Sequence, residues 1–299
     1  MAGMIGKTRQ ETKTTVVTEV FDTAAGQARG VLKGPVAAGR FKHSRHSPTV
    51  ELAGIIAHYW MVSWDLLGEE PQIRETLPHP NVHAVFEQGN SVVAGVATGK
   101  FTRVLEGRSH VFGVKFRPGG FRGFVDGPVS SLTNRMVTVR NIFGDEVVNL
   151  EQVLVSSSEE SDLVAAANAF FCARVPDLDE TSVLAGQLVD RIFTEPEIRT
   201  VDDLTKLARI GKRSLQRIFR EYVGVSPKWV IRRYRLHELV ERLHAGERMD
   251  GAALATELGY LRPGAFDQRF SVDDWIFARR ISRVECFKSV AGYVGVDSP

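Results

Sequence analysis

The stretch SLQRIFREYVGVSPKWVIRRYRL, residues 214–236, decides the fold of the C-terminal part of the chain. Gly224 predicts the end of a first helix. Ser226 and Pro227 predict the start of a longer one, because serine caps a helix N-terminus and proline is tolerated at the first helical position. The apolar residues of the first helix recur at i, i+3, i+4 and i+7, which predicts one buried face: Leu215, Ile218, Phe219 and Tyr222.

A shorter helix is predicted just upstream of this stretch. Thr200 is a suitable N-cap, and Asp202 and Asp203 follow it at the positive end of the helix. The segment ends at Ile210 and Gly211, where the next helix takes over. Two short helices across a tight turn indicate a helix-turn-helix motif.

Basic residues are concentrated on the outward side of these helices. Between Lys212 and Arg235 there are eight cations and one anion, Glu221. A basic block of this kind is often simply the solvent-exposed face of a helix. Long cationic side chains opposite an apolar stripe can also reach phosphates and base edges of DNA.

The quoted stretch resembles the first helix-turn-helix and the central linker helix of AraC-type transcription regulators. The resemblance implies that the helix 212–221 enters the major groove of double-stranded DNA. The turn departs from the family pattern, with Arg209 where glycine is common and Gly211 where a capping serine is common. The implied contacts are to bases from Arg213, Gln216 and Arg217, and to phosphates from Lys212, Arg220, Lys228, Arg232 and Arg233.

The family carries a second such motif, and AALATELGY (252–260) supplies its expected first helix. Pro263 and Gly264 then disfavour the helix that should follow. If residues 261–270 are written in suitable codons and read one base later, they begin F-D-Q-A-H-L-I-S-D, as the family would have it. We therefore hypothesise a frameshift near Tyr260, and we expect residues 261–299 to form an aberrant, poorly ordered tail.

The region before the helix-turn-helix is rich in β signals. VHAVFEQ, SVVAGVATG, TRVLEG and HVFGVKFRP alternate apolar and polar residues or are rich in Val and Phe, and glycines separate them. A short helix over roughly Val50–Tyr59 is expected to precede them. The predicted fold class is α+β, with a β-rich barrel or sandwich that resembles cupin-like sensor domains, followed by an all-α helix-turn-helix domain.

The predicted organisation has five parts. Helical periodicity in 145–193, with Pro176 between two helices, indicates a region that couples sensor and DNA-binding domains and supports dimerisation. The parts are an N-terminal arm and domain edge (1–48), a β-rich cupin-like sensor domain (49–144), a helical linker (145–193), an AraC-type DNA-binding domain (194–260) and the tail (261–299).

Several residues of the β-rich region are candidates for an effector pocket. Trp60 and Trp64 are either core or lid aromatics or a ligand box, and cations around Pro118-Gly119-Gly120 could hold an anion. His and carboxylate side chains also suggest a divalent metal, but no tight His-x-His pair is present, so no metal or cofactor is predicted. The candidate pocket residues are Trp60, Trp64, His79, His83 and Arg117.

Composition limits the class of protein. With 299 residues, 43% of them hydrophobic and 25% charged, the chain is long enough for two globular domains. No apolar run approaches the roughly 18 residues of a membrane span, and the first residues show no apolar signal region, so a cytoplasmic protein is expected. Two cysteines, Cys172 and Cys286, do not suggest a disulfide framework.

These observations predict a non-enzymatic, one-component transcription regulator. Its expected partners are double-stranded DNA, an unknown small-molecule effector and a second copy of the chain, with RNA polymerase as a further candidate and no membrane.

Three alternatives remain open. A metal-dependent cupin-type enzyme would use His79, His83 and Glu87. A DNA-repair methyl acceptor would need a reactive cysteine, whereas Cys172 lies in the apolar run AFFCARV, an inert setting. The third is a non-functional or dominant-negative regulator that lacks its second motif.

Overall fold

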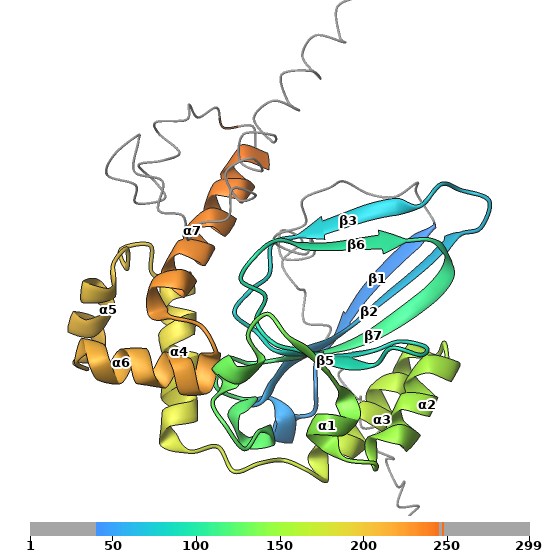
Figure 1. Ribbon diagram of the computed structural model, residues 1–299, viewed down its shortest axis with the longest axis horizontal. Helices are drawn as coiled ribbons and strands as arrows, with labels where there is room; N and C mark the ends of the chain where they lie inside the picture. Colours follow the sequence, from blue (N-terminus) through green and yellow to red (C-terminus); the bar gives the residue numbers. More distant parts are fainter. Residues whose placement is uncertain (1–39, 245–246, 248–299) are drawn as a thin grey trace, which may run out of the picture.

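The computed structural model describes residues 40–244 and Glu247. They form a β-rich body with helices against one face and a separate lobe of helices beside it (Figure 1). The predicted α+β class is therefore confirmed. Three predicted features lie outside the described residues: the arm up to residue 39, the first helix of the second motif (252–260) and the tail 261–299.

The β-rich body is built from one six-stranded antiparallel sheet and a two-stranded ribbon. The ribbon pairs β3 (Gln72–Thr76) with β6 (Phe101–Leu105) and lies over one face of the sheet (Figure 1). The four segments with strong β signals in the sequence correspond to β4, β5, β6 and β7. In spatial order the sheet is β1 (Phe41–His46), β2 (Ile56–Leu66), β7 (Gly107–Phe116), β4 (His83–Phe86), β5 (Val92–Ala94) and β8 (Met136–Thr138).

The predicted helix at Val50–Tyr59 is wrong. Only a single 3-10 turn, η1 (Val50–Leu52), forms there, and β2 begins at Ile56. The side chains of β2 pack on both faces of the sheet, so its apolar residues do not show the clean alternation of a half-exposed strand. Trp60 and Trp64 share a face because they are an even number of residues apart on a strand, not because they lie one turn apart on a helix.

One face of the sheet packs against three helices. Helices α1 (Val139–Phe143), α2 (Val147–Ser156) and α3 (Glu160–Cys172) cover this face, and their core includes a group of edge-to-face aromatic rings. Two further 3-10 turns, η2 (Arg122–Phe124) and η3 (Val129–Leu132), lead from β7 towards β8. Rings of this core include Tyr59, Phe112, Phe116, Phe121, Phe143 and Phe171.

The helical lobe has a core of its own. It comprises α4 (Glu180–Thr194), α5 (Val201–Ala208), α6 (Lys212–Ile218), the π-helical turn η4 (Phe219–Val223) and α7 (Pro227–His244). Leu188 of α4 is buried in the same cluster as Leu204, Leu215 and Phe219, and Val96 of the β-rich body joins it. The packed helical unit thus begins at residue 180, upstream of the expected boundary at 194, while α2 and α3 pack with the sheet. Pro176 does lie between two helices, α3 and α4.

The predicted helix ends are confirmed. The Thr200 hydroxyl accepts a hydrogen bond from Asp203 N (3.1 Å), and Asp203 Oδ2 accepts one from Thr200 N (2.9 Å), which is a full capping box. Ser226 Oγ accepts from Trp229 N at 3.2 Å at the start of α7. Gly224 ends η4 with φ +95°, a left-handed conformation that glycine adopts without strain.

The turn between α5 and α6 holds Arg209 in the left-handed region, with φ +54°. This conformation is unfavourable for a residue with a Cβ. We expect Arg209→Gly to raise the free energy of unfolding by about 0.5–1 kcal/mol, after the larger backbone entropy of glycine is taken into account. Urea denaturation would measure this change. Arg209→Ala should give no such gain, and equal effects of the two substitutions would contradict the explanation.

Acid should weaken the attachment of α3 to β1. A hydrogen bond from Lys42, together with contacts from His46 and Ser44, lowers the pKa of Glu160 to about 2. A carboxyl with a depressed folded-state pKa stabilises the fold above its ordinary pKa near 4.5, and this contribution is lost as the pH falls towards 2. We expect Glu160→Gln to lower Tm at pH 7 and to lower it by a much smaller amount at pH 2.5, where only part of the carboxylate's contribution remains. An equal loss of Tm at both pH values would contradict this origin.

Candidate nucleic-acid interface

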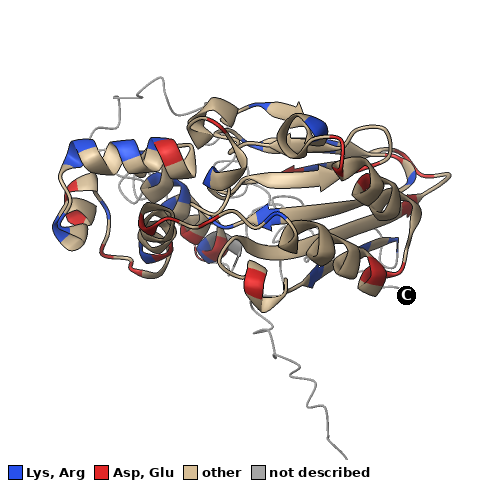
Figure 2. Cartoon of the chain, turned by 90° about the horizontal axis from the view of Figure 1, so that it is seen from below, with Lys and Arg blue, Asp and Glu red and all other residues tan. Residues whose placement is uncertain are grey.

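The rotation of α6 about its axis is set by its apolar stripe. Leu215, Ile218 and Phe219 are buried in the helical core. The opposite side of α6 and of the adjoining turn η4 is exposed to solvent, and Figure 2 shows Lys and Arg along this helical end of the molecule. The long exposed side chains of this surface, here called the α6 face, are Lys212, Arg213, Gln216, Arg217 and Arg220.

The remaining predicted phosphate contacts lie on α7. Lys228 is exposed in the first turn of α7, and Arg232 is half-buried one turn later. On the α6 face, Lys212 Nζ forms a solvent-exposed ion pair with Asp202 Oδ1 (2.6 Å) across the turn. An exposed pair of this kind is weak in water, so Lys212 can exchange this partner for a phosphate.

Arg233 does not share this exposed surface, contrary to the sequence prediction. It is only 4% exposed, and its Nη2 donates to Thr98 O at 2.5 Å. Its guanidinium group also lies 4.7 Å from the centre of the Trp229 ring. In this conformation Arg233 ties α7 to the β-rich body and is not positioned for a phosphate contact.

Arg235 has a similar structural role that the sequence did not reveal. Its Nη2 donates to Glu195 O (3.2 Å) and Ile198 O (3.3 Å), and its Nη1 contacts Glu238 (2.7 Å). These bonds satisfy carbonyl groups in the connection between α4 and α5. A basic sequence block cannot distinguish such internal donors from DNA-facing ones, because both need long cationic side chains.

The end of η4, which continues α6, is held by the β-rich body. Thr133 Oγ1 donates to Gly224 O at 2.6 Å, and Gly119 N donates to Tyr222 O at 3.1 Å. Gly119 has φ +86°, and a Cβ there would lie 2.2 Å from Ser182 O. The close approach of this loop of the β-rich body to α4 therefore requires glycine. Tyr222 Oη also donates to Asp179 Oδ2 at 2.8 Å. The segment α6–η4 therefore ends against the β-rich body.

The predicted pocket residues are not all brought together. Trp60 Nε1 donates to His83 Nδ1 at 3.2 Å, and Trp64 lies farther along the same face of β2. His79 instead stacks on His237 of α7, with ring centres 4.1 Å apart. Arg117 is exposed, and its Nε donates to Ala53 O at 2.6 Å. Only the two tryptophans and His83 remain candidates for one pocket.

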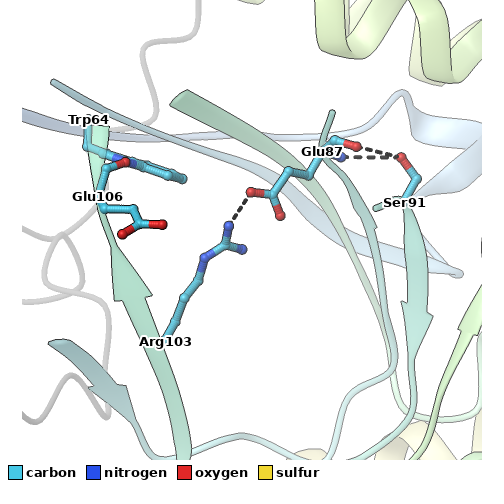
Figure 3. Close-up of polar contacts among 5 residues, drawn as sticks. All are labelled: Trp64, Glu87, Ser91, Arg103 and Glu106. Atoms are coloured by element: carbon cyan, nitrogen blue, oxygen red, sulfur yellow. Dashed lines mark hydrogen bonds and ion pairs between the residues drawn. The ribbon is translucent and has the colours of Figure 1, made fainter. Parts of the chain in front are cut away.

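The alternative metal cluster is not formed. Glu87 forms an ion pair with Arg103, which reaches across from β6 (Figure 3), while His79 and His83 have the separate partners just described. Within residues 40–244, no three His, Cys, Asp or Glu side chains are grouped so that they could hold a metal ion. Trp64 supports the arrangement around Arg103, because its ring lies 5.4 Å from the Arg103 guanidinium and its Nε1 donates to Glu106 O.

Cys172 is exposed at the end of α3, although its apolar sequence neighbours suggested an inert setting for the thiol. Phe170 and Phe171 turn towards the core, whereas the helical rotation of roughly 100° per residue takes Cys172 out of it. Its Sγ lies 3.5 Å from Thr49 Oγ1.

Comparison with known families agrees with this geometry. Residues 204–271 match a family described as a helix-turn-helix domain, and residues 44–138 match a domain of unknown function (DUF6597). No curated protein matches the chain. Among solved structures, a lysine-to-alanine variant of apo ToxT from Vibrio cholerae shows 11% identity and a TM-score of 0.26, over 74% of this chain and 86% of that one. A TM-score this low does not establish a shared overall fold.

Residues 204–271 belong to the helix-turn-helix class of DNA-binding domains. This domain is of the AraC type, and the predicted resemblance to AraC-type transcription regulators is confirmed. Among the helices that the structure describes, none is long and apolar enough to cross a membrane.

Stability measurements can distinguish cationic side chains that form internal contacts from those that are exposed on the α6 face. We expect Arg233→Ala to lower the free energy of unfolding by about 2 kcal/mol, because it removes a charged hydrogen bond within the structure. Arg220→Ala removes an exposed side chain, so its effect should stay within about 0.5 kcal/mol. Urea denaturation of both variants tests this, and a fully stable Arg233→Ala protein would show that the contact with Thr98 is unimportant.

Proposed function

We propose that this protein is a one-component transcription regulator whose β-rich domain senses a small-molecule effector and whose α6 face reads DNA. The observation that carries the proposal is the α6 face itself: exposed cations and an amide on a helix whose other side is fully buried. The helix-turn-helix match supports a DNA partner.

In the proposed complex, α6 enters the major groove. Arg213, Gln216 and Arg217 lie on its exposed side, where arginine can form paired hydrogen bonds to guanine and glutamine to adenine. Phosphate contacts would come from Lys212, Arg220, Lys228 and Arg232, on both sides of the base-reading residues. Arg233 is left out of this set because it is buried.

Coupling between the two functions is supported by the contacts at the end of η4. Thr133 and Gly119 bond to carbonyl groups at Gly224 and Tyr222, and Val96 lies in the helical core. A shift of the sensor loops on effector binding would therefore move the end of the recognition helix. Differential contacts of this kind are what a ligand needs in order to change DNA affinity.

The proposal includes a homodimer in the cytoplasm and RNA polymerase as a further partner. AraC-type regulators carry two helix-turn-helix motifs, and the proposed frameshift near Tyr260 would disrupt the second of them. Sequencing the gene across this codon tests the frameshift directly. If the second motif is lost, the chain would dimerise and bind DNA weakly, as a dominant-negative regulator does.

DNA-binding measurements on sites selected from random-sequence DNA test the roles of individual residues. We expect Arg217→Ala to cost about 1–3 kcal/mol at one base pair and to relax the preference there. Lys228→Ala should weaken binding to all sequences alike and reduce the salt slope by about one. Fluorescence anisotropy across a salt series measures both effects.

A matched control is Lys206→Ala, which removes an exposed cation of α5 outside the α6 face. Its affinity for the selected sites should remain close to that of the unmodified chain. The proposed mode of DNA reading fails if Arg217→Ala keeps full affinity and preference. The same assay on a version with the alternative reading frame after Tyr260 shows whether one motif is sufficient.

A further inference from the structure

Basic side chains line the face of the sheet that lies beneath the β3–β6 ribbon. The strand register pairs His58 of β2 with Lys115 of β7, and Lys115 with His83 of β4. Directly paired residues point to the same face, with Cβ atoms about 5 Å apart. Arg45 of β1 pairs with Trp60, two residues from His58, and so lies diagonally beside it. We call His58, His83, Lys115 and Arg45 the basic row.

Among the residues that the structure describes, the basic row carries more positive than negative charge. The described part of this face carries the carboxylate of Glu87, which is paired with Arg103. Within residues 40–244, no carboxylate forms an ion pair with Lys115 or Arg45. Cations gathered on one face without matching anions are costly to fold, unless an anion from outside is bound there.

Burial, and secondarily the neighbouring positive charges, shifts the pKa values of these groups downward. Burial, with help from the charge of Lys115, lowers the pKa of His83 to about 3. Burial also lowers the pKa of His58 to about 3, with contributions from Lys115, Arg45, His83 and His43. For Lys115, burial and then the charge of Arg45 bring the pKa to about 8. At neutral pH both imidazoles are therefore neutral, and Lys115 and Arg45 carry the charge.

Trp60 provides an aromatic wall next to the basic row. A Cβ at Gly113 would lie 1.9 Å from Cε2 of Trp60, so the indole can lie across β7 only because this residue is glycine. The indole N–H is a donor only, so its bond to His83 Nδ1 leaves the His83 proton on Nε2. His83 then presents a fixed N–H donor beside the Lys115 ammonium group.

We propose that the basic row binds the carboxylate or phosphate group of a small organic anion, with the apolar body of the ligand against Trp60. This assignment rests on the proposed sensor function and specifies its ligand: the effector is a small anion with a planar or apolar part. Lys115 and Arg45 supply the charge, and His83 supplies a directed hydrogen bond. The binding group lies on β1, β2, β4 and β7, so the sheet itself holds its geometry.

Titration calorimetry on the full chain with three related probes tests the proposal. Benzoate and phenyl phosphate represent the two anionic groups, and neutral benzamide has the same ring without the charge. We expect at least one of the two anions to bind and benzamide to bind much more weakly. Which anion binds better distinguishes a carboxylate ligand from a phosphate ligand. No binding by either anion would overturn the proposal.

Two variants assign the binding to the basic row. Lys115→Met and Arg45→Met should each lower the affinity for the anion by roughly tenfold or more. Arg45 is exposed on β1, so its substitution leaves the fold intact even if Lys115→Met does not. The control is Lys42→Met, on the opposite face of β1, where Lys42 pairs with Glu160 instead. Equal affinity in the control and in Arg45→Met would place the anion elsewhere and overturn the assignment.

Proton uptake on anion binding distinguishes a lysine that contacts the anion from a lysine with a purely structural role. A bound anion favours the charged form of Lys115, so binding near pH 8 should take up protons, which calorimetry in two buffers of different ionisation enthalpy detects. Anisotropy with DNA then separates the two proposals. If the anion binds without any effect on DNA affinity, the site stands and its sensor role is rejected. If the anion binds but the chain does not bind DNA, only the proposed function is rejected.

Discussion

Burial of one apolar stripe on α6 and η4 is the interaction on which the rest of the structure depends. Leu215, Ile218 and Phe219 fill a core with α4 and α5, and this packing fixes how α6 is rotated. Because apolar burial is the main favourable term in folding, the helix cannot turn without a large loss of stability. The outward position of Arg213 and Arg217 follows directly from this constraint.

The same core links the helix-turn-helix to the β-rich body. Val96 is buried among the helices, and Thr133 and Gly119 bond to the end of η4. Arg233 adds a further bond from α7 to Thr98. A helix-turn-helix built this way is not an independent module on a flexible linker. Its position is set by loops of the domain proposed to sense the ligand, which would give an effector a short physical route to the α6 face.

The central sheet has chemically different faces, and this difference divides its tasks. One face packs aromatic rings against α1–α3 and supplies stability. The other combines Trp60 with basic side chains from neighbouring strands. Side chains alternate between the two faces along β2 and β7, so consecutive residues of one strand have different roles. Tyr59 is therefore part of the core, while its neighbours His58 and Trp60 lie on the opposite face of the sheet, with the basic row.

The sequence by itself determined the α+β class, the helix-turn-helix with its caps at Thr200 and Ser226, and the exposed α6 face, because these follow from local periodicity and capping chemistry. It misplaced a helix at Val50–Tyr59, since a strand covered on both faces lacks a simple pattern. Only the tertiary structure decided that Arg233 is internal, that His79 and His83 lie apart, and that His58, Lys115 and His83 lie side by side. These outcomes depend on pairing between strands and helices far apart in the chain, which no local pattern encodes.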